Sequence, residues 1–267
     1  MQVEQAPGSI EKFDVIRQHR RMLANMNCYL TRESRILDFG CGAGELVYRY
    51  RDAGFDAYGF DIRPAPIYRH RGDEQYFRFA LTGKPVDVPE FGIDESRYRI
   101  PFEDRFFDFV FSTSTLEHVQ DHSLAFKEIA RVLKPGGAAI HSFPPRYTLI
   151  EPHIYVPLGG AVRSYAWYLL WACLGVRNEF QGDMSIVERA TNNWHYARTG
   201  IRYPKLKAIL KMASAHFREV HQIPHLWELR DQGIGSWWAG ALVAPRVSRY
   251  ARWLYGRFVN IVLFLRK

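Results

Sequence analysis

Three glycines that alternate with other residues follow a short apolar run at 35–39, in the stretch Asp38-Phe39-Gly40-Cys41-Gly42-Ala43-Gly44. Because glycine tolerates positive φ and lets a ligand lie directly against the backbone, this stretch predicts a ligand-binding turn between a strand and a helix. A dinucleotide-binding turn would read G-x-G-x-x-G and hold a pyrophosphate at the helix N-terminus. Here the third glycine comes one residue early, and the carboxylate of Asp38 would repel a pyrophosphate, so the turn favours a ligand with a positive charge.

Asp61 supplies a second carboxylate 17 residues after Gly44, at the end of a strand expected at 56–60. In this position a carboxylate can accept hydrogen bonds from both hydroxyls of a ribose. A nucleoside that carries a cationic amino-acid tail meets the requirements of Asp38 and Asp61 together. S-adenosylmethionine is such a ligand, and we expect it to be the cofactor.

The elements that must position these residues alternate along the first 145 residues. Apolar runs bounded by turn residues predict strands, and apolar residues at helical spacing predict helices. The expected strands are 35–39, 56–60, 106–112 and 138–143, and the expected helices are 9–29, 45–53 and 120–133, the last closed by Lys134-Pro135-Gly136-Gly137. Such alternation is typical of a parallel sheet with helices on both faces, in which ligands bind beyond the carboxyl ends of the strands.

Four motifs, taken as a set, resemble the class I S-adenosylmethionine-dependent methyltransferases of the broad type 11/12 group. They are I-L-D-F-G-C-G-A-G-E-L, Gly59-Phe60-Asp61, I-P-F-E-D-R-F-F-D-F-V-F-S-T-S-T-L-E-H-V and R-V-L-K-P-G-G, within residues 30–145. The resemblance implies an α/β fold, with a Rossmann-like, seven-stranded, mostly parallel sheet, one antiparallel strand and helices on both faces. It also implies that the cofactor lies over the ends of the first two strands.

The resemblance further implies which residues bind the cofactor: Asp38, Gly40, Gly42, Gly44, Asp61, Ile62, Asp94 and Ser112. Within this set the glycines would line the methionine part, and Asp38 would support their loop. Asp61 would hold the ribose and Ile62 would lie against the adenine. Asp94, or Glu95 beside it, would contact the adenine amino group.

Glu117 and His118 follow the third expected strand, in the motif Leu116-Glu117-His118-Val119. They could lie beside the methyl donor, where His118 would contact the substrate. The interpretation we favour is a hydrogen-bonded pair that holds the loop. Some relatives carry a further Glu four residues before this histidine and bind a divalent ion, whereas this chain has Ser114 there. Because that carboxylate is missing, the sequence predicts no metal site.

The methyl acceptor is expected beside the proline-rich segment 142–160, which follows the fourth strand. A hydroxyl acceptor needs a base that removes its proton. Glu151 and His153 lie two residues apart and face the same side of an extended segment, so we expect His153 as the general base, oriented by Glu151. Arg146 or Tyr147 would bind the substrate. The alternative is a buried proline loop in which His153 is only structural.

Composition places the chain among ordinary globular proteins: 267 residues, 47% apolar and 24% charged. Three cysteines without paired spacing exclude a disulfide scaffold or a Cys-type zinc site and fit a reducing cytosol, so a cytoplasmic location is expected. The opening residues lack the apolar segment of a signal peptide. Residues 1–150 hold 20 Lys/Arg and 21 Asp/Glu, whereas residues 151–267 hold 16 and 7 together with all seven tryptophans. The net charge of +8 therefore belongs to the second half.

These patterns predict four parts: a cofactor-binding core at 1–145, an aromatic-rich lid at 146–200, a closing helix and hairpin at 201–245, and a C-terminal helix at 246–267. A helix is expected near 204–214, and the hairpin would pair 216–222 with 239–244. The last part carries six basic residues, no acidic ones, and apolar residues at helical spacing. We expect it to lie on an anionic membrane surface, to dock into a partner, or to pack on its own domain. Nucleic acid is the least favoured partner, because the core carries no excess charge.

Together these features predict an enzyme that transfers a methyl group from S-adenosylmethionine to a small-molecule or lipid-linked acceptor, most simply an oxygen of a sugar or similar metabolite. The alternative is a non-catalytic module of the same fold that acts in assembly or at a membrane surface. The intact glycine turn and Asp61 favour the enzyme.

Overall fold

The computed structural model describes residues 15–62, 67–79, 98–223, 254 and 257–267. The strands of these residues are β1 (Arg35–Phe39), β2 (Asp56–Asp61), β3 (Phe77–Phe79), β4 (Phe107–Thr113), β5 (Leu133–Phe143), β6 (Glu219–Ile223) and β7 (Ile261–Arg266). The α-helices are α1 (Val15–Asn25), α2 (Glu45–Asp52), α3 (His122–Val132), α4 (Tyr165–Cys173), α5 (Ile186–Thr199) and α6 (Leu206–Ser214). Three short 3-10 helices are η1 (Asp73–Tyr76), η2 (Leu116–His118) and η3 (Glu179–Gln181).

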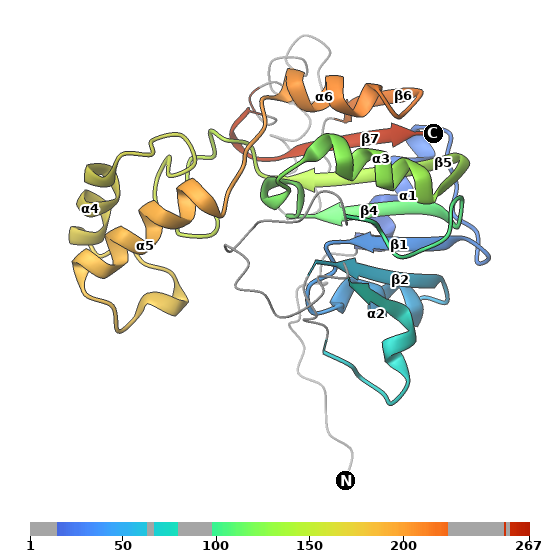
Figure 1. Ribbon diagram of the computed structural model, residues 1–267, viewed down its shortest axis with the longest axis horizontal. Coiled ribbons are helices and arrows are strands. Elements are labelled where there is room, and N and C mark those ends of the chain that lie inside the picture. The colour runs from blue at the N-terminus through green and yellow to red at the C-terminus, as the bar shows by residue number, and fades with distance from the viewer. Residues whose placement is uncertain (1–14, 63–66, 80–97, 224–253, 255–256) are drawn as a thin grey trace, which may run out of the picture.

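The strands form one sheet in the order β3-β2-β1-β4-β5-β7-β6 (Figure 1). The first five strands of this order pair in parallel, and β7 runs antiparallel to both β5 and β6. This arrangement confirms the predicted Rossmann-like, seven-stranded and mostly parallel sheet. The strand order reverses between β1 and β4, so a crevice opens beyond the carboxyl ends of these two strands.

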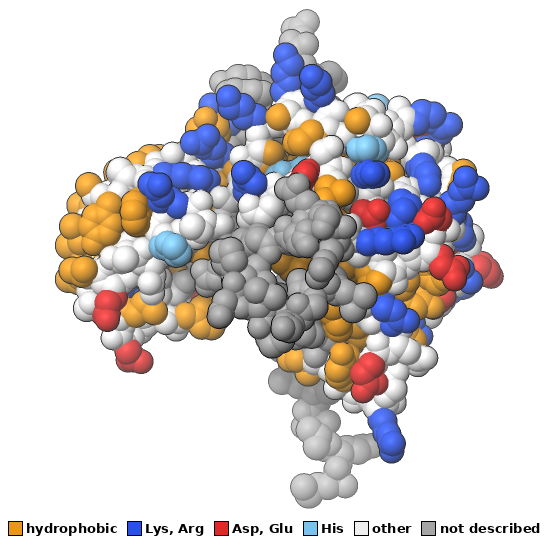
Figure 2. Space-filling view, in the orientation of Figure 1, with side chains coloured by type: hydrophobic (Ala, Val, Ile, Leu, Met, Phe, Trp, Pro, Cys, Tyr) orange, Lys and Arg blue, Asp and Glu red, His pale blue; other side chains and the backbone are white. Residues whose placement is uncertain are grey.

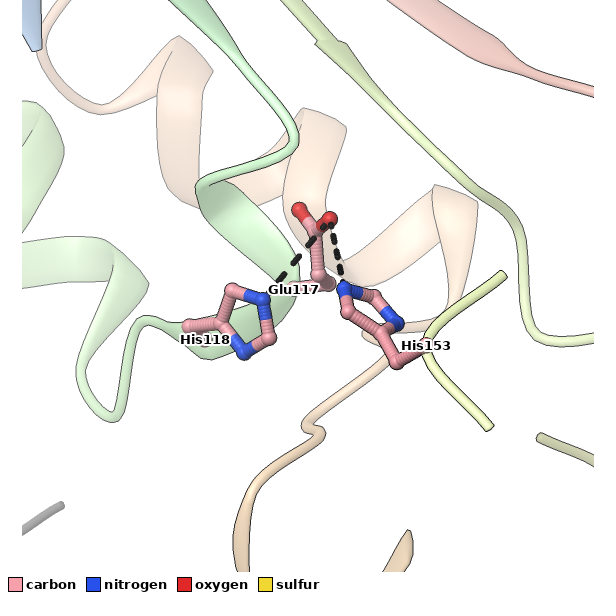
Figure 3. Close-up of side chains that lie close together, drawn as sticks. All are labelled: Glu117, His118 and His153. Carbon is pink, nitrogen blue, oxygen red and sulfur yellow. Dashed lines mark ion pairs between the residues drawn. The ribbon is translucent and has the colours of Figure 1, made fainter. Parts of the chain in front are cut away.

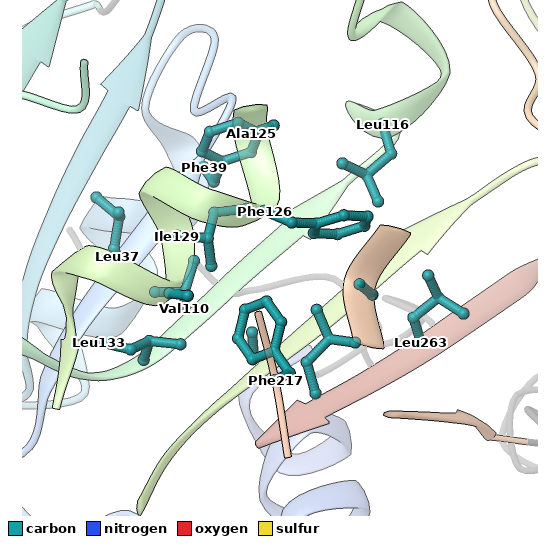
Figure 4. Packing of buried hydrophobic residues seen from close by; sticks show 14 of the residues in the cluster. Leu37, Phe39, Val110, Leu116, Ala125, Phe126, Ile129, Leu133, Phe217 and Leu263 are labelled. Atoms are coloured by element: carbon teal, nitrogen blue, oxygen red, sulfur yellow. The ribbon is translucent and has the colours of Figure 1, made fainter. Parts of the chain in front are cut away.

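Alternate residues of each central strand enter two separate cores, one on each face of the sheet. On one face Leu37, Val110 and Leu263 pack with Phe126 and Ile129 of α3 and with residues of α6 (Figure 4). Because both faces of the sheet are covered by helices, the strands read as nearly continuous apolar runs in the sequence.

The other face of the sheet packs against α1 and α2. Ile36, Phe109 and Val262 lie in this second core, with Leu23 of α1 and Tyr50 of α2. Neighbouring positions in each strand therefore serve opposite cores, for example Ile36 and Leu37. The register of every central strand is fixed by this double burial.

The C-terminal helix predicted at 246–267 is wrong for residues 261–266, which form the buried strand β7 between β5 and β6, whereas residues 246–253 and 255–256 lie outside the described residues. The apolar residues at helical spacing include Ile261 and Leu265, which are buried in the sheet and cannot lie on a membrane surface. Leu263 and Phe264, which do not fit the helical spacing, are fully buried as well. A run that is apolar at every position is typical of a central strand covered on both faces.

The first strand of the predicted hairpin is confirmed as β6. β6 pairs with β7, whereas the predicted partner 239–244 lies outside the described residues. Lys134-Pro135-Gly136-Gly137, predicted to close the helix at 120–133, follows the end of α3 and lies within β5 as a bulge, since Phe107 pairs with Leu133 but Phe109 pairs with Ala138. The edge strand β3, three residues long, was not predicted.

Between β5 and α6 the chain leaves the sheet and forms a smaller helical unit, which projects to one side of the sheet (Figure 1). Its core joins Ile154 and Val156 of the preceding loop to Tyr168 of α4 and Ala190 of α5. The Trp167 indole donates a hydrogen bond of 2.8 Å to the Pro157 carbonyl. Trp167 and Trp171, which share one face of α4, are both half-buried in this packing.

Hydrophobic side chains gather over α4 at the outer end of this unit (Figure 2). Leu170 and Leu174 are exposed there. Among the described residues, no helix is both long and apolar enough to span a bilayer.

Candidate active site

The glycine turn that follows β1 adopts left-handed backbone geometry at three positions. Gly40, Gly42 and Gly44 have φ of 83°, 48° and 83°. A Cβ on Gly40 would lie 2.2 Å from the Thr115 side chain, so the turn and the segment after β4 approach one another too closely for a larger residue. The Gly40 N–H donates a hydrogen bond of 2.7 Å to the Phe60 carbonyl at the end of β2.

Asp61 ends β2 and faces this turn. One carboxylate oxygen accepts a hydrogen bond of 2.9 Å from the Gly42 N–H, and the other accepts one of 2.7 Å from the Ile62 N–H. The two bonds hold the carboxylate at the crevice between β1 and β2. Sequence spacing places Asp61 at the end of the strand, and the fold brings it to the glycine turn.

A pocket opens beyond the carboxyl ends of β1, β2 and β4. It is lined by Phe39, Gly40, Phe60, Asp61, Ile62, Tyr98, Ser114, Thr115, His118, Val119, Gln120, Asp121 and Leu124. Aromatic and aliphatic walls suit an adenine ring, and the Asp61 carboxylate can accept hydrogen bonds from ribose hydroxyls.

Asp38 lies next to this pocket at the end of β1 and is only 3% exposed. Burial, with the charge of Asp61 as a further cause, raises the pKa of Asp38 to about 8. A carboxyl group in this state would be stabilised as a carboxylate by a cation placed nearby. The pocket therefore fits S-adenosylmethionine, a nucleoside with a positively charged sulfonium and ammonium.

Besides Asp38, four of the predicted cofactor contacts, Gly42, Gly44, Asp94 and Ser112, are not among the residues that line the pocket. The Ser112 hydroxyl is buried within the sheet, 2.8 Å from His141 Nδ1, and Ser112 does not line the pocket. Alternate strand residues face opposite ways, and Ser112 faces into the sheet packing. Gly44 caps α2, and the Gly42 N–H donates to Asp61. Asp94, with its neighbour Glu95, lies outside the described residues.

Tyr98, Ser114 and Thr115 line the pocket although the sequence reasoning did not single them out for it. Ser114 has a positive φ of 51°, and its N–H donates a hydrogen bond to the Ser142 carbonyl, which turns the chain out of β4 toward the pocket. A polar run directly after a buried strand was the available signal. Tyr98 offered none, because its place depends on tertiary packing.

A second group of polar side chains surrounds Glu151, which is fully buried. One of its oxygens accepts the backbone N–H groups of His153 and Ile154. The other lies 2.7 Å from His153 Nδ1 and accepts the Tyr203 hydroxyl at 2.7 Å. Burial opposes ionisation, but the hydrogen bonds from His153 and Tyr203 lower the pKa of Glu151 below its ordinary value.

The structure thus brings Glu151 and His153 into the predicted contact. Because a carboxylate only accepts, Nδ1 of His153 donates and Nε2 is left to face Glu117, whose Oε1 lies 3.9 Å away. Burial acts against the imidazolium, but Glu151 beside the ring raises the pKa of His153 above its ordinary value.

The His118 ring is oriented like that of His153, with Nδ1 hydrogen-bonded and Nε2 facing Glu117. Its Nδ1 donates a hydrogen bond of 2.7 Å to the Gly200 carbonyl, and its Nε2 lies 4.0 Å from Glu117 Oε1. Burial lowers the pKa of His118, which favours the neutral ring. The two imidazoles meet edge to face, with ring centroids 4.9 Å apart.

Glu117 lies between the two rings and is fully buried (Figure 3). Neither of its carboxyl oxygens has a hydrogen-bond partner among the described residues. Burial raises the pKa of Glu117 to about 7. The prediction that Glu117 and His118 form a hydrogen-bonded pair is wrong, because the contact is 4.0 Å long and the Nδ1 proton of His118 goes to Gly200.

Glu117, His118 and His153 offer ligand atoms that all lie within 4.8 Å of one another, so these three side chains could hold a metal ion. We refer to them as the Glu117 cluster. His118 also lines the cofactor pocket, and the cluster is therefore next to it.

Arg146 and Tyr147, the predicted substrate contacts, lie apart from this cluster. They line a second pocket at the same edge of the sheet, together with Lys205 and Arg257. The Arg257 guanidinium stacks over the Tyr147 ring at 4.5 Å. Their expected role at the methyl acceptor remains a prediction.

Part of the chain is similar to known proteins. Residues 37–141 match the family model described as a methyltransferase domain. The chain is 26% identical to a sterol 4-C-methyltransferase of Caenorhabditis elegans over 68% of this chain and 55% of that protein. It is 32% identical to a ubiquinone biosynthesis O-methyltransferase of Dechloromonas aromatica over 39% of this chain and 41% of that protein. The matched region thus spans only about half the length of these relatives.

Solved structures align with this chain at low sequence identity. A phosphoethanolamine N-methyltransferase 2 of Haemonchus contortus aligns with a TM-score of 0.48 at 17% identity, over 93% of this chain and 52% of that one. An S-adenosylmethionine-dependent methyltransferase of Mesorhizobium loti aligns with a TM-score of 0.48 at 15% identity, over 92% and 96%.

The matched residues run from β1 to β5 and contain the glycine turn, Asp61 and the Glu117-His118 pair. The matched residues include the strands that flank the cofactor pocket. On these grounds residues 37–141 are similar to the methyltransferase domain family whose model they match, and the sheet agrees with the resemblance to class I S-adenosylmethionine-dependent methyltransferases.

Proposed function

We propose that this methyltransferase transfers its methyl group to an oxygen of a small-molecule or lipid-linked acceptor, a hydroxyl of a sugar or of a similar metabolite. The observation that carries the proposal is His153, whose Nδ1 donates to a buried carboxylate so that Nε2 is directed into the Glu117 cluster beside the cofactor pocket. Oxygen acceptors need such a group, because a hydroxyl must lose its proton as it is methylated.

The relatives support an acceptor with a large apolar part, while the sterol relative is named as a C-methyltransferase. The names of three matched proteins refer to a sterol, to ubiquinone biosynthesis and to tocopherol. Sterols and tocopherol carry a ring hydroxyl and ubiquinone carries a quinone ring, and all three combine the ring with a large apolar group. A lipid-linked acceptor of this kind is consistent with the aromatic residues of the α4/α5 unit.

In the proposed reaction the residues of the chain bind the cofactor, orient the catalytic imidazole and activate the acceptor oxygen. Bound S-adenosylmethionine supplies an electrophilic methyl group on a sulfonium. Asp61 holds the ribose, and Asp38 favours the positive charge near the glycine turn. His153 activates the acceptor oxygen, and Glu151 is a positioning residue that fixes the imidazole. Alignment of the oxygen with the methyl carbon and exclusion of water supply most of the rate enhancement.

Residues 146–200 are proposed to form the wall of the acceptor site. Both ends of this segment meet at the Glu117 cluster, because His153 lies near its start and the Gly200 carbonyl that accepts from His118 lies at its end. Because both ends of the segment are anchored at the cluster, the amino-acid sequence of its outer part can change while the cluster keeps its geometry.

Calorimetry with S-adenosylhomocysteine and a methyl-transfer screen test the proposal in two steps. Asp61→Ala is expected to lose cofactor binding, whereas Asp56→Ala, at the half-exposed start of β2, is the matched control. In the screen, labelled methyl should pass from S-adenosylmethionine to quinols, hydroxylated lipids or sugars. Transfer only to nitrogen or carbon atoms would reject the oxygen acceptor, and unchanged binding by Asp61→Ala would reject the cofactor site.

A further inference from the structure

We propose that Glu117, His118 and His153 form a binding site for one divalent transition-metal ion, with Zn²⁺ as the representative ion. The inference rests on the proposed function only for what the ion would do to the acceptor. Ion binding itself can be measured without any acceptor or methyl donor.

The ligand atoms converge from two elements that are distant in sequence. Glu117 and His118 belong to η2, whereas His153 comes from the loop after β5 (Figure 3). Both Nε2 atoms point to the same carboxylate oxygen, at 4.0 and 3.9 Å. Ligand atoms of a tetrahedral zinc site lie about 3.3 Å apart, whereas these atoms lie within 4.8 Å of one another, so closure around an ion shortens no distance by more than about 1.5 Å.

Hydrogen bonds from the outer nitrogens orient both rings for metal binding. His118 Nδ1 donates to the Gly200 carbonyl, and His153 Nδ1 donates to Glu151, which Tyr203 holds in turn. Metal-binding histidines almost always donate their other ring nitrogen to a carbonyl or carboxylate, because this selects the tautomer whose free lone pair binds the ion. Both histidines of the cluster meet this condition.

Glu117 is the second, independent observation. Its side chain is fully buried, and neither oxygen has a hydrogen-bond partner in the part of the chain that the structure describes. A buried carboxyl group without partners destabilises a fold, so its presence calls for an explanation. If the two histidines served only in packing, the carboxyl group would stay unsatisfied. An ion between the three side chains would satisfy it.

The mixture of donors selects the class of ion. Two imidazole nitrogens with one carboxylate suit zinc and other first-row transition ions, whereas magnesium and calcium prefer oxygen donors. The missing carboxylate at Ser114, on which the prediction of no metal site depended, is irrelevant to this set, because His153 supplies the third ligand atom.

Three protein ligands leave an open position for a substrate oxygen. A hydroxyl bound there loses its proton more readily, since the ion stabilises the alkoxide or phenolate. In this form of the site His153 activates the acceptor as a ligand of the ion, and the hydroxyl proton passes to water instead of to Nε2. The inference thus deepens the proposed function by assigning how the cluster activates oxygen.

The test uses untagged full-length protein, stripped with a chelator and titrated with Co²⁺ while its visible d–d absorption is followed. Zn²⁺ should displace Co²⁺ at one equivalent per chain, and Mg²⁺ in large excess should not. Glu117→Gln and His153→Ala should each weaken Co²⁺ binding by at least about tenfold. His195→Ala, which changes an exposed histidine of α5, is the matched control and should bind like the wild type.

Absence of a Co²⁺ spectrum, or equal affinity in the wild type and in both cluster variants, would overturn the site. S-adenosylhomocysteine binding and a thermal melt show whether each variant is folded, and His118→Ala replaces any variant that is not. Loss of methyl transfer on chelation, restored by Zn²⁺, supports the role of the ion at the acceptor. Full transfer by the metal-free protein would overturn that role while the proposed methyl acceptor stands.

Discussion

The Tyr203 hydroxyl donates a hydrogen bond of 2.7 Å to Glu151, across a separation of 52 residues. This bond joins the segment before α6 to the loop after β5. It also completes the set of hydrogen bonds around a fully buried carboxylate that holds His153 in place. The orientation of the proposed catalytic imidazole therefore depends on a residue outside the loop that carries it.

Tyr203→Phe removes this hydrogen bond and keeps the ring. Loss of a hydrogen bond to a charged, buried group is expected to lower the free energy of unfolding by about 1.5–3 kcal/mol. Turnover should fall about tenfold, because the imidazole is held less firmly. Cofactor affinity should stay unchanged, since Tyr203 does not line the cofactor pocket. A loss of cofactor affinity as large as the loss of turnover would contradict a positioning role.

His153→Ala tests the proposed catalytic residue directly. Turnover should fall by about 10²-fold or more, the usual contribution of a group that assists proton removal. Calorimetry should show normal binding of S-adenosylhomocysteine, because His153 is not part of the pocket lining. His195→Ala serves as control. Retained turnover in His153→Ala would leave His153 a structural residue.

Asp38 should release a proton when the cofactor binds. Its pKa of about 8 in the free protein means that the carboxyl group is mostly protonated below pH 8, and a bound cation lowers this pKa. Affinity for S-adenosylmethionine should therefore rise between pH 6 and 8, by at most about tenfold per pH unit. Calorimetry in buffers of different ionisation enthalpy measures the released proton.

Two comparisons isolate the contribution of Asp38. Asp38→Asn should abolish the release, and S-adenosylhomocysteine, which lacks the sulfonium charge, should cause less of it. Proton uptake on binding, or equal release by Asp38→Asn, would show that another group titrates.

Val262→Ala tests the assignment of the C-terminal segment to the sheet. Val262 is 1% exposed in β7, so removal of its two methyl groups should cost about 2 kcal/mol of unfolding free energy. Val259→Ala, three residues earlier and 50% exposed, is the matched control and should cost less than about 0.5 kcal/mol. Chemical denaturation measures both. Equal small effects would argue against a buried strand at 261–266.

Much of the cofactor side could be predicted from the sequence, because its signals are local. The strands at 35–39 and 56–61, the glycine turn and the carboxylate at a strand end each lie within a few residues of what they determine. Positive φ at Gly40 and the place of Asp61 follow from short-range geometry. These features were sufficient to predict a parallel α/β sheet and the cofactor, whereas the seven strands with one antiparallel strand were implied by the resemblance to class I S-adenosylmethionine-dependent methyltransferases.

The rest was decided by tertiary structure, because it depends on residues distant along the chain. Residues 261–266 have an apolar pattern compatible with a helix or a strand, and only their insertion between β5 and β6 makes them β7. Ser112 follows the sheet's alternation into the interior. Glu117 is separated by 36 residues from His153, and no spacing rule connects them. Local propensity determines elements, whereas packing of distant segments determines which polar groups become buried together, and the Glu117 cluster is a product of that packing.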